Sequence, residues 1–319
     1  MNRILITGAN GQIGSELREE LVKIYERSHV ISVDLKKPEY YNENAMGPFE
    51  LQDVADRQGM ELLIDKHHID TVFHLVGILS AKGERNPELA WNVNVNSLKH
   101  ILDFAKEKKL RVFWPSSIAV FGPTSPKEST PQATILEPSS MYGLTKVTGE
   151  LLCNYYCHKY NVDVRSLRFP GLISYKTPPG GGTTDYAVEI FYEAIRHKSY
   201  TCFLRKETVL PMMYMPDAIR AILQLMAAPA ESLRIRTSYN LTASSFSVNE
   251  LAEEIKKHIP DFKLLADPDE RQKIADSWPK TIDDSIARKD WGWRHEYDLV
   301  AMVKGMLVNL KQIALLRAS

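Results

Sequence analysis

The chain has 319 residues, and its 40 basic residues balance 40 acidic ones to give a formal net charge of +0 at pH 7. This length fits a nucleotide-binding domain with a smaller second lobe, and the balanced charge argues against nucleic acid or an anionic membrane as a partner. Three cysteines are too few for a disulfide framework, and no stretch reaches the roughly 18 apolar residues of a membrane span, so we expect a cytoplasmic protein.

Short apolar runs alternate with amphipathic stretches through the first half of the chain. Strands are predicted at residues 4–6, 30–33, 71–75, 112–114 and 164–168. Helices are predicted between them, at residues 12–25, 55–66, 89–108 and 142–159. Such alternation is typical of an α/β fold in which helices cover both faces of a doubly wound parallel sheet, the Rossmann architecture.

The second half of the chain is less regular. Three consecutive glycines at 180–182 indicate a loop, and an extended segment is expected at 238–241. Helices are predicted at 186–197, 217–226 and 248–258, the last with Ser245 or Ser247 as its N-cap. We expect residues 1–170 and 212–242 to form the nucleotide-binding domain. Residues 171–211 and 243–319 would form a smaller, discontinuous, mixed α/β substrate lobe.

A glycine motif opens the first predicted helix. Glycines there let the backbone approach a pyrophosphate closely, and the N–H groups of the helix N-terminus bind its negative charge. The alternative is an ordinary glycine turn, which the preceding strand, the following helix and a later acidic residue make less attractive. The residues expected around the phosphates are Gly8, Asn10, Gly11, Gln12, Ile13 and Gly14.

The acidic residue is Asp34, which follows the second predicted strand directly. A carboxylate at this place accepts hydrogen bonds from the ribose hydroxyls of adenosine and repels a 2′-phosphate, so NAD is favoured over NADP. Lys36 and Lys37 weaken that repulsion slightly. Asp34 could instead simply end a strand.

Two further strand ends bear on the cofactor. Asp53 and Val54 stand where a carboxylate could meet the adenine amino group, although a helix cap explains them nearly as well. The segment after His74 ends the fourth strand where the cofactor would cross, so its main chain and the small Gly77 matter most. We interpret His74 itself as structural and not as a metal ligand.

Tyr142 and Lys146 lie four residues apart on a predicted helix, so phenol and ammonium project from one face. A cation held beside the phenol favours the phenolate and lowers the pKa of the tyrosine, as a general base near neutral pH requires. The sequence therefore predicts a proton-transfer pair beside a dinucleotide site.

These motifs stand in the order found in the extended short-chain dehydrogenase/reductase superfamily, which the chain resembles over almost its whole length. The resemblance also rests on Asn94, Ser116-Ser117, Arg168-Phe169-Pro170-Gly171, Tyr214-Met215-Pro216-Asp217-Ala218, Tyr239-Asn240-Leu241 and Trp291-Gly292-Trp293. It implies that Tyr142 is the catalytic acid or base, that Lys146 binds the nicotinamide ribose and activates Tyr142, and that Ser117 hydrogen-bonds the reacting oxygen. Further implied cofactor contacts are Leu35, Leu75, Val76, Gly77, Asn94, Pro115, Pro170 and Leu172.

Three stretches, at residues 113–117, 178–186 and 271–279, resemble the short-chain type of L-threonine 3-dehydrogenase. This resemblance implies NAD-dependent oxidation of the threonine β-hydroxyl to 2-amino-3-oxobutyrate. It implies no metal ion, and the scattered cysteines and histidines offer no matching ligand set. The residues expected at the substrate are Ser80, Ser116, Ser117, Tyr142, Thr183, Thr184, Asp185 and Trp278. Trp278 could equally serve as a core anchor.

Two other functions stay open at this point. Most extended members act on nucleotide sugars, so a nucleotide-sugar epimerase is the main rival. A dehydratase is disfavoured, because Ile118 and Ala119 stand where it would carry an acid pair. A non-catalytic dinucleotide sensor would keep the fold but needs no proton-transfer group.

The resemblance also implies partners and a location. Members of the superfamily commonly form homodimers through the helices that correspond to residues 89–108 and 142–159, and the apolar faces of these helices permit a four-helix contact. Threonine degradation implies a functional link to the next enzyme, a 2-amino-3-oxobutyrate CoA ligase. A mitochondrial location would require a targeting segment before this numbering.

Overall fold

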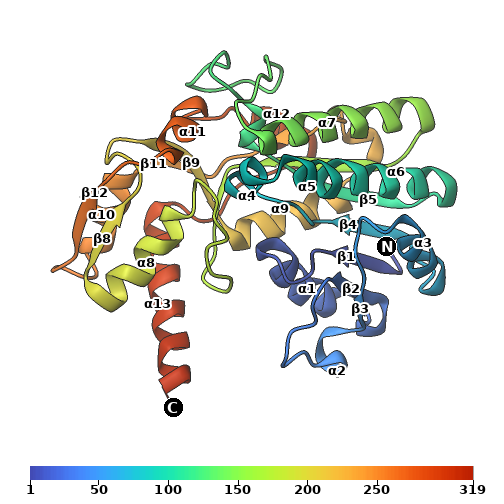
Figure 1. Cartoon of the computed structure of the whole chain (residues 1–319), viewed down its shortest axis with the longest axis horizontal. Coiled ribbons are helices and arrows are strands. Elements are labelled where there is room, and N and C mark those ends of the chain that lie inside the picture. Colours follow the sequence, from blue (N-terminus) through green and yellow to red (C-terminus); the bar gives the residue numbers. More distant parts are fainter. Residues whose placement is uncertain (319) are drawn as a thin grey trace.

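The computed structural model describes residues 1–318, and its central element is a seven-stranded parallel sheet (Figure 1). The strands run in the spatial order β10-β6-β5-β4-β1-β2-β3. Their bounds are β1 (Ile4–Thr7), β2 (Val30–Asp34), β3 (Phe49–Leu51), β4 (Thr71–His74), β5 (Arg111–Ser117), β6 (Val164–Phe169) and β10 (Tyr239–Asn240). Chain order reverses between β1 and β4, which is where a doubly wound sheet leaves a crevice for a dinucleotide. The predicted fold class is confirmed.

Alternate strand residues enter two separate cores, one on each face of the sheet. On β1, Leu5 packs on one face, whereas Ile4 and Ile6 pack on the other. Strands buried on both faces are therefore continuously apolar, as parallel sheets require. The covering helices are α1 (Gln12–Ile24) and α9 (Met215–Ala227) on one face, and α3 (Arg57–Lys66), α6 (Ser97–Lys108) and α7 (Met141–Tyr160) on the other (Figure 1).

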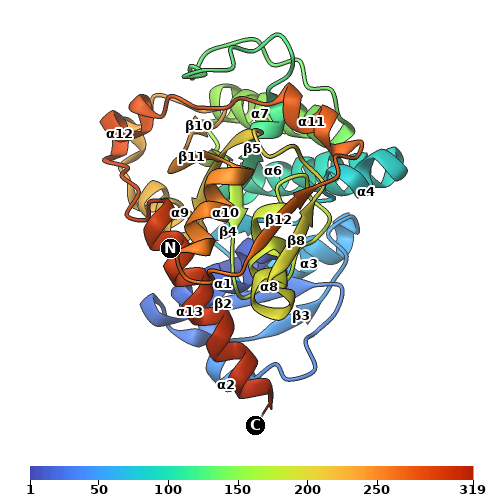
Figure 2. The same cartoon turned by 90° about the vertical axis from the view of Figure 1, so that its left-hand side faces the viewer.

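Residues after β6 build most of a second, smaller lobe (Figure 2). Within the described residues it holds a sheet of order β11-β9-β7 and a strand pair β12-β8. Its elements are β7 (Gly171–Ile173), α8 (Tyr186–His197), β8 (Ser199–Cys202), β9 (Val209–Tyr214), β11 (Ser244–Ser247), α10 (Val248–Lys256), β12 (Lys263–Ala266) and α13 (Leu299–Ala318). The core of this lobe also receives Ile118 and Phe121 from the segment after β5.

Two segments of the second half return to the large sheet, in keeping with the expected discontinuous division. Strand β10 pairs with β6, and α9 packs against α1. Ala287 and Trp293 pack into the same core as α9, although residues 243–319 were all expected in the second lobe. The division into domains stays a prediction, and this segment is where the contacts differ from it.

The helix predicted at residues 89–108 consists of three pieces. These are α5 (Pro87–Trp91), a π-helical turn η2 (Asn92–Asn96) and α6. Single π-turns inside helices are frequent at functional sites. The remaining short elements are η1 (Arg27–His29), α2 (Glu43–Met46), α4 (Ser80–Arg85), η3 (Ile118–Val120), η4 (Ala230–Ser232), α11 (Arg271–Ser277) and α12 (Ser285–Trp291).

Side-chain caps explain where several helices begin. Ser140 accepts a hydrogen bond from the Gly143 N–H at the start of α7. Ser247, one of the two predicted caps, begins α10 and forms a reciprocal capping box with Glu250. Each such cap satisfies a backbone donor that the helix cannot satisfy itself.

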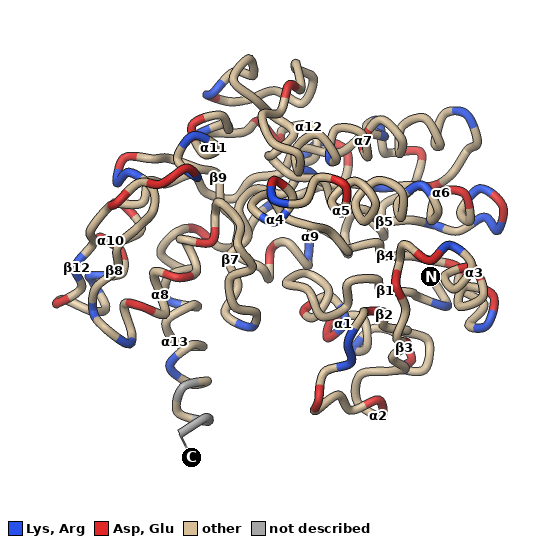
Figure 3. Tube along the Cα trace, in the orientation of Figure 1, with Lys and Arg blue, Asp and Glu red and all other residues tan. Residues whose placement is uncertain are grey.

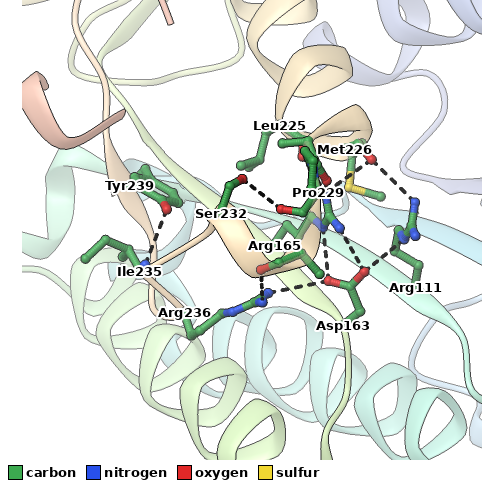
Figure 4. Close-up of polar contacts among 12 residues, drawn as sticks. Arg111, Asp163, Arg165, Leu225, Met226, Pro229, Ser232, Ile235, Arg236 and Tyr239 are labelled. Carbon is green, nitrogen blue, oxygen red and sulfur yellow. Dashed lines mark hydrogen bonds and ion pairs between the residues drawn. The ribbon is translucent and has the colours of Figure 1, made fainter. Parts of the chain in front are cut away.

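A cluster of arginines joins the amino ends of β5 and β6 to α9 (Figure 4). Asp163 pairs with Arg165 at 3.0 Å, Arg111 at 3.0 Å and Arg236 at 3.5 Å. Arg165 also donates to the last carbonyl oxygens of α9 and beyond, those of Leu225, Met226 and Ala228. Cations at a helix C-terminus satisfy its free carbonyls and the negative end of its dipole. This arginine cluster lies at the sheet edge opposite the carboxyl ends.

Charged residues of both signs are interspersed along the whole trace (Figure 3). This agrees with the balanced composition. None of the helices within residues 1–318 has the length and apolarity to cross a membrane.

Candidate active site

A cavity of about 500 Å³ opens at the carboxyl ends of β1, β4, β5 and β6. Among residues 1–318, every predicted site residue lines it except Leu35, Asp53, Val54 and Asn94. The cavity is also lined by five residues that were not predicted as site residues: Leu79, Ile118, Phe169, Gly171 and Gly182. Each of these neighbours a predicted residue in the chain, so adjacency is the signal that could have found them.

The glycine motif shapes one end of the cavity. Gly8 has a φ of +67°, and an added Cβ would lie 2.8 Å from the Val76 nitrogen. At Gly14 an added Cβ would lie 2.2 Å from the carbonyl oxygen of Gly8. Because Gly11, the N-cap of α1, has no side chain, the first N–H groups of the helix are available to a phosphate.

Asp34 and Asn10 form the adenosine end of the cavity. The Asp34 carboxylate accepts from the Asn10 N–H at 3.0 Å and from the Leu35 N–H at 2.8 Å, which leaves lone pairs for ribose hydroxyls. The buried Asn10 Oδ1 has no partner, and the Asp34 carboxylate beside it has lone pairs left over. Both can accept hydrogen bonds from the hydroxyl groups of a ligand, so these residues suit NAD.

Three predicted cofactor residues occupy other places. Leu35 is 68% exposed. Asp53 accepts from the Ala55 N–H at 2.9 Å, which is the cap-like alternative, and Val54 is buried in the core beside α3. Residues 53 and 54 therefore do not line the cavity.

Asn94 lies behind the cavity wall, within the π-turn η2. It donates to the Ile78 carbonyl and to the Thr145 hydroxyl at 3.0 Å each, and accepts from the Ile78 N–H at 2.7 Å. Asn94 therefore ties the chain after β4 to α7, and supports Gly77 from behind.

Tyr142, Lys146 and Ser117 converge on the cavity from α7 and the end of β5. Burial raises the pKa of Tyr142 to about 12, and a hydrogen bond with Ser117 acts in the opposite direction. Burial lowers the pKa of Lys146 to about 7. Burial penalises the charged form of both groups, and the Lys146 Nζ lies 5.5 Å from the tyrosine ring centroid, so the activation of Tyr142 by Lys146 stays a prediction.

The neighbouring serines at the end of β5 have different partners. Ser116 is buried and donates to a Glu150 carboxylate oxygen at 2.6 Å. Ser117 accepts from the Ala119 N–H at 3.2 Å, so its own proton is free for Tyr142 or a ligand. This geometry favours Ser117 over Ser116 as the group at the reacting oxygen.

His74 is fully buried between Thr7 and Ser97, with 2.9 Å to each hydroxyl. Burial, reinforced by the positive charges of Lys146 and His100, lowers its pKa to about 3. The ring is therefore neutral, in keeping with a structural role. Among the described residues, no group of three or more His, Cys, Asp or Glu side chains is placed to hold a metal ion.

The end of the segment after β7, residues 182–185, lines the cavity. Thr183 is 2% exposed, lines the cavity, and its hydroxyl is buried without a partner. Asp185 accepts from the N–H groups of Gly181 and Gly182 at 2.7 and 2.8 Å, so its carboxylate shapes the glycine loop. Trp278 lines the cavity and is also buried in the core of the second lobe. Its position is therefore compatible with both predicted roles, a wall of the substrate site and a core anchor.

Strand β7 and the start of the segment that follows it rest on α1. Gln12 donates to the Leu172 carbonyl at 3.5 Å, and Ser15 lies 3.4 Å from the Thr177 hydroxyl. Further contacts join Ser174 to Glu16 and Lys176 to Glu19. The helix that faces the phosphates thus also holds the chain that leads to the cavity-lining residues 182–185.

The model of the NAD dependent epimerase/dehydratase family matches residues 4–241. The chain belongs to this family. It is 50% identical over 308 residues to an uncharacterized epimerase/dehydratase of Staphylococcus saprophyticus, with 96% of each chain covered. An L-threonine dehydrogenase structure from Clostridium difficile superposes with a TM-score of 0.95 at 50% identity, covering 98% of both chains. The holo form of an L-threonine dehydrogenase from Cupriavidus necator gives 0.94 at 50% identity, covering 97% of this chain and 99% of that chain.

Membership of the NAD dependent epimerase/dehydratase family confirms the predicted superfamily and fold. It also confirms NAD as the cofactor and the class of NAD-dependent oxidoreductase. The roles of the individual site residues stay predictions, which the geometry of this family member makes testable.

Proposed function

We propose that the chain oxidises L-threonine at its 3-hydroxyl to 2-amino-3-oxobutyrate. The observation that carries this proposal is the similarity, over nearly the whole chain, to structures named L-threonine dehydrogenases. The convergence of Ser117, Tyr142 and Lys146 on a cavity that reaches the 174–185 segment supports it. The 2-amino-3-oxobutyrate would then pass to a 2-amino-3-oxobutyrate CoA ligase.

The proposed proton transfer uses three side chains of the chain itself. The Tyr142 phenolate takes the proton of the β-hydroxyl, and Ser117 donates a hydrogen bond to the oxygen as it becomes a carbonyl. The Lys146 ammonium stabilises the phenolate, because opposite charges interact strongly in surroundings from which water is excluded. NAD, when bound, supplies the acceptor for the hydride that leaves the same carbon.

Threonine carries an ammonium and a carboxylate, and both need polar partners in a buried site. The orphan hydroxyl of Thr183 and the buried Ser80 line the cavity, and Asp185 supplies a negative charge next to them. A small zwitterion therefore finds both donors and a carboxylate at this end.

A spectroscopic experiment separates this function from its rivals. The purified protein is mixed with NAD and L-threonine, and NADH absorbance is followed. A threonine dehydrogenase produces NADH, whereas a nucleotide-sugar epimerase responds only to a nucleotide sugar. A dinucleotide sensor binds NAD and turns over neither substrate.

The role of the base is tested by Tyr142→Phe. This variant should bind NAD almost normally but lose at least about 100-fold in kcat, because general-base catalysis contributes 10²–10⁴-fold. NAD affinity is measured by calorimetry, and the thermal unfolding midpoint controls for folding. Turnover close to that of the wild type would contradict the assignment of Tyr142.

We also propose a homodimer formed through α5, α6 and α7. Large apolar side chains are exposed on two of these helices. They are Trp91 on α5 and Leu144, Leu151 and Tyr155 on α7. Exposed apolar residues gathered on adjacent helices are typical of a surface that a second copy covers.

A further inference from the structure

Glu150 is a buried acidic residue that the proposed reaction does not use. It follows Lys146 by one turn of α7 and Tyr142 by two turns, so the three side chains share one face of the helix. This face packs against β5 and β6. Glu150 is only 1% exposed, and a charge buried so completely requires bound partners.

Both carboxylate oxygens of Glu150 are occupied. One accepts from Arg168 Nε at 2.8 Å and from the Ser116 hydroxyl at 2.6 Å, and the other accepts from Arg168 Nη2 at 2.7 Å. Arg168 donates in turn to the Gln132 carbonyl and to Asn240 Oδ1, at 3.0 Å each. A bidentate pair of this kind fixes the orientation of the carboxylate. Glu150 therefore links α7, which also carries Lys146, to Ser116 on β5 and Arg168 on β6.

The Lys146 ammonium is enclosed mainly by uncharged groups. It donates to the Pro115 carbonyl at 2.6 Å and lies 4.4 Å from the Trp114 ring centroid. The titratable or charged groups around it are Tyr142, Glu150 and Cys153 on α7, His74 on β4 and Arg168 on β6.

Glu150 is the carboxylate of this group that acts on Lys146. Burial lowers the pKa of Lys146 to about 7, and negative charge on Cys153 or Glu150 acts against this. Burial raises the pKa of the Cys153 thiol, which therefore stays uncharged, and His74 is neutral because its pKa is lowered to about 3.

We propose that Glu150 is a positioning residue that keeps Lys146 in its ammonium form and, through Ser116, fixes the strand end that presents Ser117. The inference rests on the proposed function, in which Lys146 must be charged to stabilise the Tyr142 phenolate. Arg168 holds Glu150 in place.

The first test measures Lys146 directly and needs no turnover. Protein labelled with ¹³C-lysine is titrated by NMR, and the Lys146 signal is assigned with Lys146→Arg. Glu150→Gln should lower the pKa of Lys146 by about one unit, because a nearby opposite charge is lost. Glu150→Asp, which keeps the charge, should return it towards the wild-type value. An unchanged pKa in Glu150→Gln would overturn the proposal.

The matched control is Glu253→Gln, which removes the same charge from an exposed pair with Lys256 on α10. It should leave the pKa of Lys146 and the activity unchanged. Because Glu150→Gln could fail to fold, Glu150→Gln with Arg168→Gln removes both charges together. This double variant should also lower the Lys146 pKa, because Glu150 lies one helical turn from Lys146 on α7 whereas Arg168 approaches from β6, and no change in it would count against the proposal.

The second test uses activity with NAD and L-threonine. Glu150→Gln should move the alkaline limb of the kcat profile to lower pH and reduce kcat about tenfold above it, with KM for NAD little changed. A purely structural role would lower activity without moving this limb, and that result would overturn the proposal. If the wild type itself leaves threonine unchanged, the proposed function has failed, and the NMR titration still decides the role of Glu150.

Discussion

Ser116 and Ser117 are adjacent hydroxyls with opposite surroundings, because successive residues of a strand point to opposite sides. Ser116 reaches the buried Glu150, and Ser117 reaches the cavity beside Tyr142. The sequence predicts both at the substrate, and it cannot rank them, since their ranking depends on which side α7 packs. The placement of α7 determines which serine faces the cavity and which faces Glu150.

The two serines should respond differently to removal of the hydroxyl. Ser117→Ala should lower kcat about 100-fold with unchanged stability, because it removes a donor to the developing oxyanion. Ser116→Ala should lower the free energy of unfolding by about 1–3 kcal/mol, because a buried carboxylate loses a donor, while kcat falls less. Steady-state kinetics and denaturant unfolding of both variants check this. A larger loss of kcat in Ser116→Ala would reverse the assignment.

Other site residues could be predicted because their chemistry is local. The glycine motif, Asp34, Tyr142 and Lys146 each require a residue type at a fixed spacing, and all of them line the cavity. The protonation states could not be predicted, because they depend on burial. Tyr142 and Lys146 are shifted by the desolvation of their charges, which spacing along a helix does not reveal.

At the scale of elements, amphipathic helices and apolar strands were predictable, and two kinds of element were not. The π-turn η2 interrupts a helix whose polar and apolar pattern gives no sign of it. Helix α13 buries Met302, Met306 and Leu310 but also exposes Val300 and Val308. Apolar side chains therefore lie on more than one side of this helix. A helix without a polar face shows no 3.6-residue alternation by which to recognise it.

The arginine cluster that joins β5 and β6 to α9 makes the free energy of unfolding depend on pH. Burial acts to raise the pKa of Asp163, but hydrogen bonds and charges of Arg165, Arg111 and Arg236 outweigh it and the net shift is downward. A carboxyl with a lowered pKa in the folded state stabilises the fold above its unfolded pKa of about 3.9, and this stabilisation is lost as pH falls through the folded value.

Asp163→Asn should therefore lower the free energy of unfolding at pH 7 by about 3 kcal/mol, because the buried Arg165 loses its counter-charge. Below about pH 4 the difference from the wild type should shrink, since the wild-type carboxyl is then increasingly protonated. Urea unfolding at several pH values measures both effects. A difference that stays constant down to pH 2 would show that charge is not the cause.

At the scale of the whole molecule, the proposed homodimer depends on the exposed apolar side chains of α5 and α7. Leu151→Glu should give a monomer in light scattering, because it places a charge in the centre of the contact. The matched control is Leu62→Glu on α3, a leucine that is 63% exposed and lies outside that surface. Equal masses for the wild type and Leu151→Glu would contradict the proposed interface.

The pairing of β10 with β6 and the packing of α9 on α1 agree with the expected return of residues 212–242 to the sheet, and the division into lobes stays a prediction. The place of residues 285–293 was not predictable. Trp293 gives no periodic signal, yet it is fully buried with α9 and its indole donates to Asp284 at 3.0 Å. Its packing depends on three-dimensional neighbours that are distant in sequence.

The contact between the 174–185 segment and α1 has a kinetic consequence. Because residues 172–177, which contact α1, lead along the chain to the cavity-lining residues 182–185, the position of that wall depends on how firmly α1 is held. A nucleotide bound at the start of α1 would steady that wall before the amino acid arrives. Binding should then be ordered, with nucleotide entering first and leaving last, and product inhibition by NADH should be competitive with NAD at every threonine concentration.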